Sequence, residues 1–300
     1  TDGTVLARHL NKHITSYNAD LGTADEKQKS LATPLDLAFK PDGTRVYVAA
    51  FGSQAVGWFK PSELESNSFV PSAARQIPLT AGGPSGLALD NARNQLYVLT
   101  RFDNGISVVD LATATETKHL KMFNPEPAVV RNGRALLYDA RLTSSRGDSS
   151  CAGCHVFGDM DHLAWDLGNP DERQVGNPNP YNSVVPKFLQ RPVFHPMKGP
   201  MTTQSFRGMR GNGPMHWRGD RTGVTKDANE TVEEQAFEDF NVAFTGLLGR
   251  SSALTTAQMD AFAKFALNLI YPPNPHRRLD NKLSTSEQAG KNFYFGPVSD

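Results

Sequence analysis

Five consecutive residues, Cys151 to His155, have the types and spacing of a c-type haem attachment motif, Cys-x-x-Cys-His. Each thiol can form a thioether with one vinyl group of a porphyrin, and the imidazole that follows can bind the iron. The motif therefore predicts one covalently attached haem c, held by Cys151, Cys154 and His155, with His155 as the proximal iron ligand. Such a group implies a redox role.

The rest of the sequence narrows the chemistry of this motif. The chain of 300 residues contains 2 cysteines, so a zinc or iron–sulfur site made of three or four thiolates is excluded. The alternative interpretation is a disulfide, or a thioredoxin-like redox pair followed by an unrelated histidine. Thioredoxin-like pairs usually follow a hydrophobic strand, whereas residues 143–150 form a polar run, and this favours haem attachment.

A haem iron has a second axial position, and its occupant decides the chemistry. A Met or His ligand there is typical of an electron carrier, whereas an open position can bind and activate peroxide. Met201 directly follows the stiff segment Lys198-Gly199-Pro200, and His216 precedes Trp217, so Met201 and His216 are predicted as alternative distal ligands. The other downstream candidates are Met197, Met209, Met215, His162 and His195.

Composition places limits on partners and compartment. Lys and Arg number 31 and Asp and Glu number 31, which gives no electrostatic reason to expect nucleic acid or an anionic membrane as a partner. No apolar stretch reaches the roughly 18 to 20 residues that span a bilayer. Because haem is attached covalently outside the bacterial cytoplasmic membrane, the motif predicts a periplasmic or extracellular protein.

The N-terminal half contains an internal repeat. Residues 34–48 align without a gap with residues 84–98, and each copy has an apolar strand, a polar turn and a strand containing Val-Tyr-Val or Leu-Tyr-Val. Third strands are predicted at residues 55–59 and 106–110. Three or four antiparallel strands at a period of about 50 residues are typical of one blade of a β-propeller.

These units resemble the YVTN-type propeller repeats of secreted bacterial proteins. Residues 1–123 are therefore predicted to form about two to three blades of an incomplete, all-β propeller. Because a closed ring needs roughly four to eight blades, either the region before residue 34 is the tail of another blade in a longer chain, or a partner supplies the rest. We accordingly expect the sequence to be a piece of something larger.

The whole chain is predicted to be multidomain, with a mostly α domain following the propeller blades. Helical periodicity in residues 133–142, 231–240 and 255–269 indicates a cytochrome c-like haem domain over residues 124–282. Two arginines after the motif, Arg218 and Arg221, are candidates to pair with haem propionates, although both can instead bind nearby carboxylates such as Asp220 and Glu233.

Several segments of this half resemble the first haem domain of the bacterial di-haem cytochrome c peroxidase and methylamine-maturase superfamily. They are residues 133–139 leading to Cys154-His155, residues 203–208 with 216–221, and residues 231–236. The resemblance implies that Trp217 is an electron relay between two haems, the alternative being a buried indole that pins its loop. Residues 283–295 resemble the helix that introduces a second haem motif, so residues 283–300 are expected to begin a second, truncated haem domain.

The residues support three functional hypotheses. The first is an extracytoplasmic c-type cytochrome that transfers electrons to a redox partner or other cytochrome subunits, with the propeller as scaffold or docking domain. The second is a di-haem peroxidase or oxidase whose second haem lies beyond residue 300. Residues 240–248 contain no Glu, Met or His at the place where peroxidase members carry an acid, which disfavours peroxide chemistry at this haem. The third is a structural role, with the haem as a covalent staple.

Overall fold

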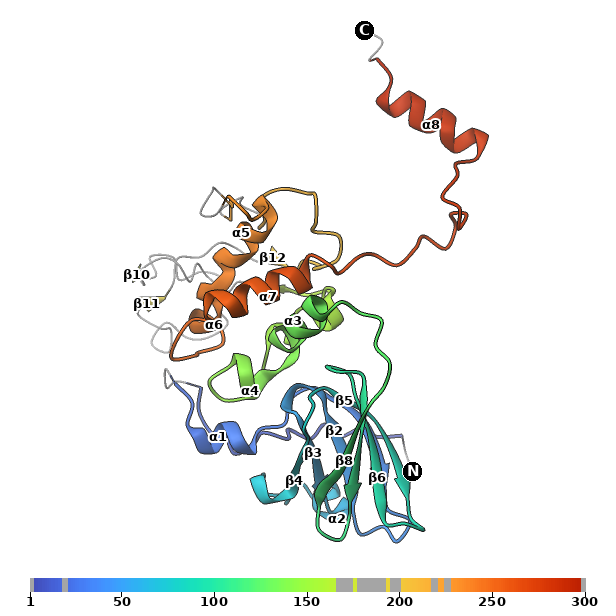
Figure 1. The fold of residues 1–300 in the computed structure, drawn as a ribbon. Coiled ribbons are helices and arrows are strands. Elements are labelled where there is room, and N and C mark those ends of the chain that lie inside the picture. Colours follow the sequence, from blue (N-terminus) through green and yellow to red (C-terminus); the bar gives the residue numbers. More distant parts are fainter. Residues whose placement is uncertain are drawn as a thin grey trace. The chain divides into compact units, whose positions relative to one another are not determined.

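The computed structural model describes residues 3–17, 21–165, 175–176, 193–194, 201–216, 221–223 and 228–297 (Figure 1). The chain divides into two compact units, Thr1–Leu269 and Ile270–Asp300. Among the described residues, no helix is both long enough and apolar enough to cross a membrane.

The first repeat forms a four-stranded antiparallel sheet in the order β1-β2-β3-β4. The turn between β1 and β2 is the predicted one: Gly43 has a φ of +68°, a value that favours glycine, and the Asp42 carboxylate accepts hydrogen bonds from the N–H and hydroxyl of Thr44. The strands are β1 (Pro34–Phe39), β2 (Val46–Ala50), β3 (Ala55–Phe59) and β4 (Gln76–Pro78).

The second repeat forms a second four-stranded antiparallel sheet, and its first three strands have the same register as those of the first sheet. Ala38 pairs with Tyr47 in the first sheet, and Ala88 pairs with Tyr97 in the second. Both first strands also carry an irregularity directly after their initial proline, Pro34 or Pro84, so the sequence repeat is a structural repeat as well. The strands are β5 (Pro84–Asp90), β6 (Gln95–Thr100), β7 (Gly105–Asp110) and β8 (Thr115–Lys121).

The two sheets share one hydrophobic core. Strands β1 and β5 are neighbours, and Asp36 Oδ2 accepts a hydrogen bond of 2.7 Å from the N–H of Leu87. Because side chains alternate between the faces of a strand, one face of each sheet supplies this core. Its buried members are Tyr47, Val56, Ile77, Leu79, Leu96, Val98, Val109 and Leu111.

The helices begin and end close to the predicted places, with one break. The segment predicted as a single helix over residues 133–142 is α3 (Ala128–Tyr138) followed by α4 (Ala140–Thr143). Asp139 interrupts it, because this residue has an extended backbone and its carboxylate caps α4 by accepting from the N–H of Leu142 at 3.0 Å. The other helices are α1 (Ala24–Lys29), α2 (Pro61–Glu65), α5 (Val232–Glu238), α6 (Val242–Gly246), α7 (Thr256–Ala266) and α8 (Thr285–Phe295).

Helices α3 and α7 pack closely because of one glycine. A Cβ at Gly133 would lie 2.1 Å from the carbonyl oxygen of Ala261, so only glycine permits this approach. Two short ladders that the sequence pattern did not predict also occur in this half. They pair β9 (Ala164–Trp165) with β12 (Met201–Thr202), and β10 (Val175–Gly176) with β11 (Val193–Phe194).

The sheets and the helices of the first unit are joined by buried contacts. The Phe51 ring lies edge-on to Phe102 at 5.4 Å and to Tyr138 of α3 at 5.0 Å. Gln54 also donates a hydrogen bond to the buried carboxylate of Asp139. The domain boundary predicted between residues 123 and 124 falls inside one compact unit. The division of the chain into a propeller part and a haem domain at that point stays a prediction.

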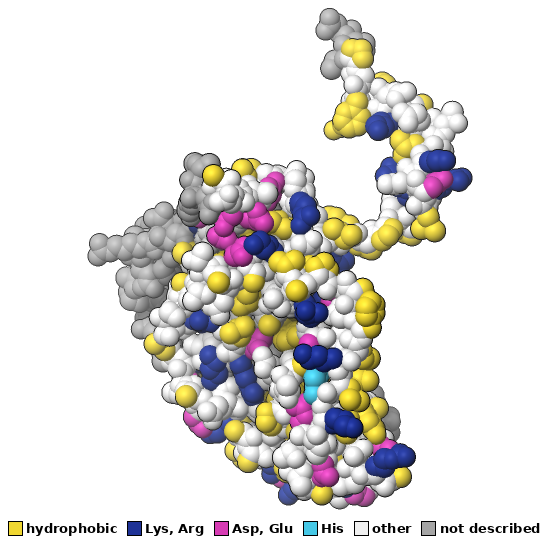
Figure 2. Space-filling model, viewed as in Figure 1, with side chains coloured by type: hydrophobic (Ala, Val, Ile, Leu, Met, Phe, Trp, Pro, Cys, Tyr) yellow, Lys and Arg dark blue, Asp and Glu magenta, His cyan; other side chains and the backbone are white. Residues whose placement is uncertain are grey.

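The second unit carries the helix predicted for residues 283–295. Helix α8 begins with a capping box, in which Ser284 and Glu287 each bond the other's backbone N–H. Its C-terminal aromatic residues are largely solvent-exposed: Phe293 by 91%, Tyr294 by 80% and Phe295 by 75%. Figure 2 shows hydrophobic side chains along the surface of this segment.

Candidate haem site

The Cys-x-x-Cys-His motif forms a single helical turn. The N–H groups of Cys154 and His155 both donate to the carbonyl of Cys151, at 3.2 and 2.9 Å. Residues three and four positions apart lie close together on such a turn, so Cys151 is brought near both Cys154 and His155. Ala152, 7% exposed, anchors the turn in the core formed by α3, α5 and α7.

Burial keeps both thiols protonated. It raises the pKa of Cys151 to about 12, and burial together with the nearby charge of Asp161 raises the pKa of Cys154. Thioredoxin-like pairs depend on a lowered thiol pKa, which makes the thiolate available. The environment of this pair therefore disfavours the dithiol redox interpretation.

His155 is oriented by one hydrogen bond. Its Nδ1 lies 2.7 Å from the backbone carbonyl oxygen of Gln204. A carbonyl can only accept, so Nδ1 carries the proton and Nε2 keeps its lone pair. Burial also lowers the pKa of His155, which favours the neutral ring. This arrangement is the one that a metal-binding imidazole requires.

The segment after the motif exposes an unusual amount of apolar surface. The five exposed side chains are Val156 (40%), Phe157 (53%), Met160 (39%), Leu163 (53%) and Trp165 (42%). All five lie within the ten residues that follow His155 in sequence, and exposed apolar side chains gathered in one segment are typical of a binding surface. The donor set and its surroundings therefore fit a flat, largely apolar porphyrin bound through two thiols and one imidazole.

The predicted distal ligands lie on different segments. Met201 is half-buried on β12, where it pairs with Trp165, on the strand that leads into Gln204. His216 has a φ of 72° and packs its ring edge-on against Phe240, with 5.5 Å between ring centroids. The assignment of the distal ligand to Met201 or His216 stays a prediction.

Only some of the other predicted site residues lie in the part of the chain that the structure describes. The Arg221 guanidinium lies 5.2 Å from the centroid of the Phe240 ring, so Arg221 and His216 contact the same aromatic side chain. Trp217 and Arg218 lie outside the described residues, as do Met197 and His195. Met209 and Met215 pack against the helical core.

Two contacts of the site were missed by sequence reasoning. The carbonyl of Gln204 has no signature in sequence, because every residue carries one. Phe206 packs its ring against His155, and only its position within the segment 203–208 drew attention to it.

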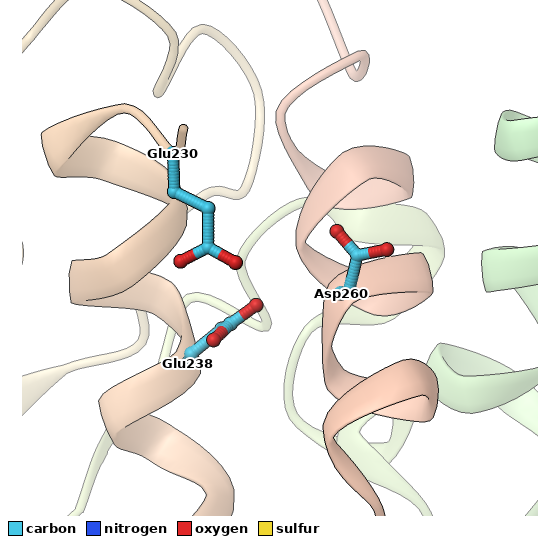
Figure 3. Close-up of side chains that lie close together, drawn as sticks. All are labelled: Glu230, Glu238 and Asp260. Carbon is cyan, nitrogen blue, oxygen red and sulfur yellow. The ribbon is translucent and has the colours of Figure 1, made fainter. Parts of the chain in front are cut away.

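A second cluster of chemistry-bearing residues lies away from the motif. Glu230, Glu238 of α5 and Asp260 of α7 have carboxylate oxygens within 4.8 Å of one another (Figure 3). Lys264 pairs with Asp260 at 2.5 Å, so a cation of the chain balances part of this charge. The cluster is therefore a partly buried group of acidic side chains with one lysine as ion-pair partner.

Comparison with known proteins adds little to this description. No family model and no curated protein matches the sequence. Among solved structures, the chain is similar to one titled "Kuenenia stuttgartiensis Hydrazine Synthase", with 17% identity over 29% of this chain and 24% of that chain and a TM-score of 0.25. The chain is also similar to a structure titled "Kuenenia stuttgartiensis Hydrazine Synthase Pressurized with 20 bar Xenon". There the identity is 21% over 59% of this chain and 48% of that chain, with a TM-score of 0.36. The aligned part thus spans less than half of each solved chain, and similarities of this size assign no function.

Proposed function

We propose that this chain is an extracytoplasmic c-type cytochrome that transfers single electrons through one covalently bound haem. The observation that carries the proposal is the hydrogen bond from His155 Nδ1 to the Gln204 carbonyl, because it leaves Nε2 free to bind iron beside two protonated thiols. A bound haem c would supply a one-electron ferric/ferrous couple.

Each residue of the site has a distinct role in this proposal. Cys151 and Cys154 each add their S–H across one vinyl double bond, which forms a C–S bond and places the hydrogen on the neighbouring carbon without any oxidant. His155 binds the iron through Nε2, while Gln204 holds the proton on Nδ1. The apolar side chains of residues 156–165 exclude water from the group. Arg218 and Arg221 are proposed as partners of the propionates, Met201 or His216 as distal ligand, and Trp217 as electron relay.

The two sheets are proposed to be blades of a β-propeller that serves as scaffold or docking surface. Support comes from the matching register of their first three strands and from the core that the two sheets share. The remaining blades would come from the same chain or from another one. A periplasmic or extracellular location and a redox partner protein follow from the proposed haem.

An optical spectrum of the purified protein tests the proposal. We expect a low-spin c-type spectrum after dithionite reduction, unchanged by carbon monoxide, and a reversible one-electron couple in a redox titration. The protein would be expressed in a host that attaches haem covalently. Purified protein that carries no covalent haem, or that shows no reversible one-electron couple, contradicts the proposal. Prompt binding of carbon monoxide would instead show an open distal position and favour an enzyme.

A di-haem peroxidase or oxidase is the second candidate. The exposed aromatic residues of α8 favour it, because Phe293 and Tyr294 need a partner to bury them and a second haem domain would supply one. A second Cys-x-x-Cys-His motif encoded shortly after Asp300 would support this candidate, and its absence from the gene would remove it.

A further inference from the structure

Two residues of the segment from Gln204 to Phe206 contact His155, each in a different way. The Gln204 carbonyl oxygen accepts from Nδ1 at 2.7 Å. The Phe206 ring lies against the imidazole, with 4.1 Å between ring centroids and 33° between ring planes. A hydrogen bond in the plane of a ring and an aromatic contact on its face together restrict rotation of that ring.

This three-residue segment is itself held firmly. The N–H of Phe206 donates to the carbonyl of Gly158 at 3.0 Å, which ties the segment to the chain immediately after the motif. The Phe206 ring also packs edge-on against Phe237 of α5 at 5.7 Å and lies 6.4 Å from Phe262 of α7. Phe237 and Phe262 are each 3% exposed, so the orientation of His155 is linked to the helical core.

We propose that Phe206 is a positioning residue that, with the Gln204 carbonyl, fixes the plane of the His155 imidazole. The inference rests on the proposed function, because the plane matters only if Nε2 binds an iron. The orientation and basicity of an axial imidazole affect the electronic structure and reduction potential of a haem. The proposal therefore assigns Phe206 control over the potential without any direct bond to the iron.

Two matched substitutions test the proposal in the full-length holoprotein. Phe206→Leu removes the ring against His155, and Phe244→Leu removes a ring from the same aromatic core, where Phe244 lies edge-on to Phe262 at 6.1 Å. Phe206→Tyr keeps the ring and serves as the rescue variant. The measurements are covalent haem content by pyridine haemochromogen, the paramagnetic NMR shifts of the haem methyl groups, the reduction potential, and the urea midpoint.

We expect Phe206→Leu to retain haem but to change the spread of the methyl shifts and the reduction potential, and we expect Phe206→Tyr to restore both. Phe244→Leu should lower the urea midpoint while leaving the methyl shifts as in the wild type. Unchanged shifts in Phe206→Leu, or equal changes in Phe244→Leu, would overturn the positioning role. Wild-type protein without covalent haem would overturn the proposed function itself, and the two failures are thus distinguishable.

Discussion

The paired sheets and the segment beside the haem motif differ in how much of their apolar surface the chain itself buries. In the sheets, strands bury their own core, and side chains such as Val56 and Leu96 have no exposed surface. Beside the motif, a two-residue ladder holds a segment on which Phe157 and Leu163 are more than half exposed. The comparison teaches that the first region buries a central core by itself while leaving Leu37 and Phe39 of β1 more than half exposed, whereas the second offers apolar surface and one free imidazole nitrogen to a group from outside the chain.

The largest expected effect comes from removing the thiols of the second region. Cys151→Ala with Cys154→Ala should abolish covalent haem completely, because no other cysteine is present. The sheets should keep their circular dichroism signal, since they do not depend on the haem. Haem staining on a denaturing gel measures the loss. Staining that survives the double substitution would contradict the assigned attachment site.

A matched pair of core substitutions compares the two regions directly. Leu96 in the sheet core and Leu137 in α3 are both 0% exposed. Replacing either by Ala should lower the free energy of unfolding by about 2–5 kcal/mol, through lost burial and the cavity that remains. Urea denaturation measures both.

Only one of the pair should also affect haem attachment. Leu137 lies close to Gly158, which follows the motif by three residues: a Cβ at Gly158 would lie 4.0 Å from Leu137 Cδ2. L137A should therefore reduce haem content more than L96A at equal stability. Equal haem content in both variants would show that the motif is independent of the helical core.

A smaller effect is expected within the second sheet. His119 Nε2 lies 2.7 Å from Asp103 and its Nδ1 lies 3.1 Å from the hydroxyl of Ser107, which is fully buried. His119→Ala removes the hydrogen bond that each of these groups makes with the imidazole and should cost about 1–3 kcal/mol of unfolding free energy. His9→Ala, at an exposed position, is the control and should cost almost nothing. Equal losses would mean that the network does not stabilise the sheet.

The smallest effect is a pH dependence at the junction between sheets and helices. Burial raises the pKa of Asp139 above its ordinary 3.8, although Leu142 and Gln54 donate hydrogen bonds to it. The folded state therefore holds a proton that the unfolded state releases, and its stability falls as the pH rises from about 3.8 through the raised pKa.

Asp139→Asn isolates this dependence. The variant keeps a neutral cap on α4 and lacks the titration. Its stability relative to the wild type should rise with pH across that window, as measured by urea midpoints at several pH values. A constant difference would contradict a raised pKa.

Much of this architecture was predictable from local pattern. The repeat at residues 34–48 and 84–98 predicted two sheets, because alternating apolar residues and a Pro-Asp-Gly turn act within a few residues of each other. The break at Asp139 was not predicted, although Asp139 caps α4 locally by accepting from the N–H of Leu142. The hydrogen bond from Gln54 to Asp139 was not predictable, because Gln54 lies 85 residues away in sequence. Phe206 was missed for the same reason, because its contacts are with residues distant in the chain.

By itself the sequence predicted the chemistry, from two thiols and an imidazole at haem-attachment spacing, and determined a repeat of strands. Residue type and short-range spacing suffice for both. Only the tertiary structure decided which nitrogen of His155 is free, which ring lies against it, and which thiols are buried. Those properties arise from contacts between segments far apart in the chain, where burial and hydrogen bonding set protonation and orientation.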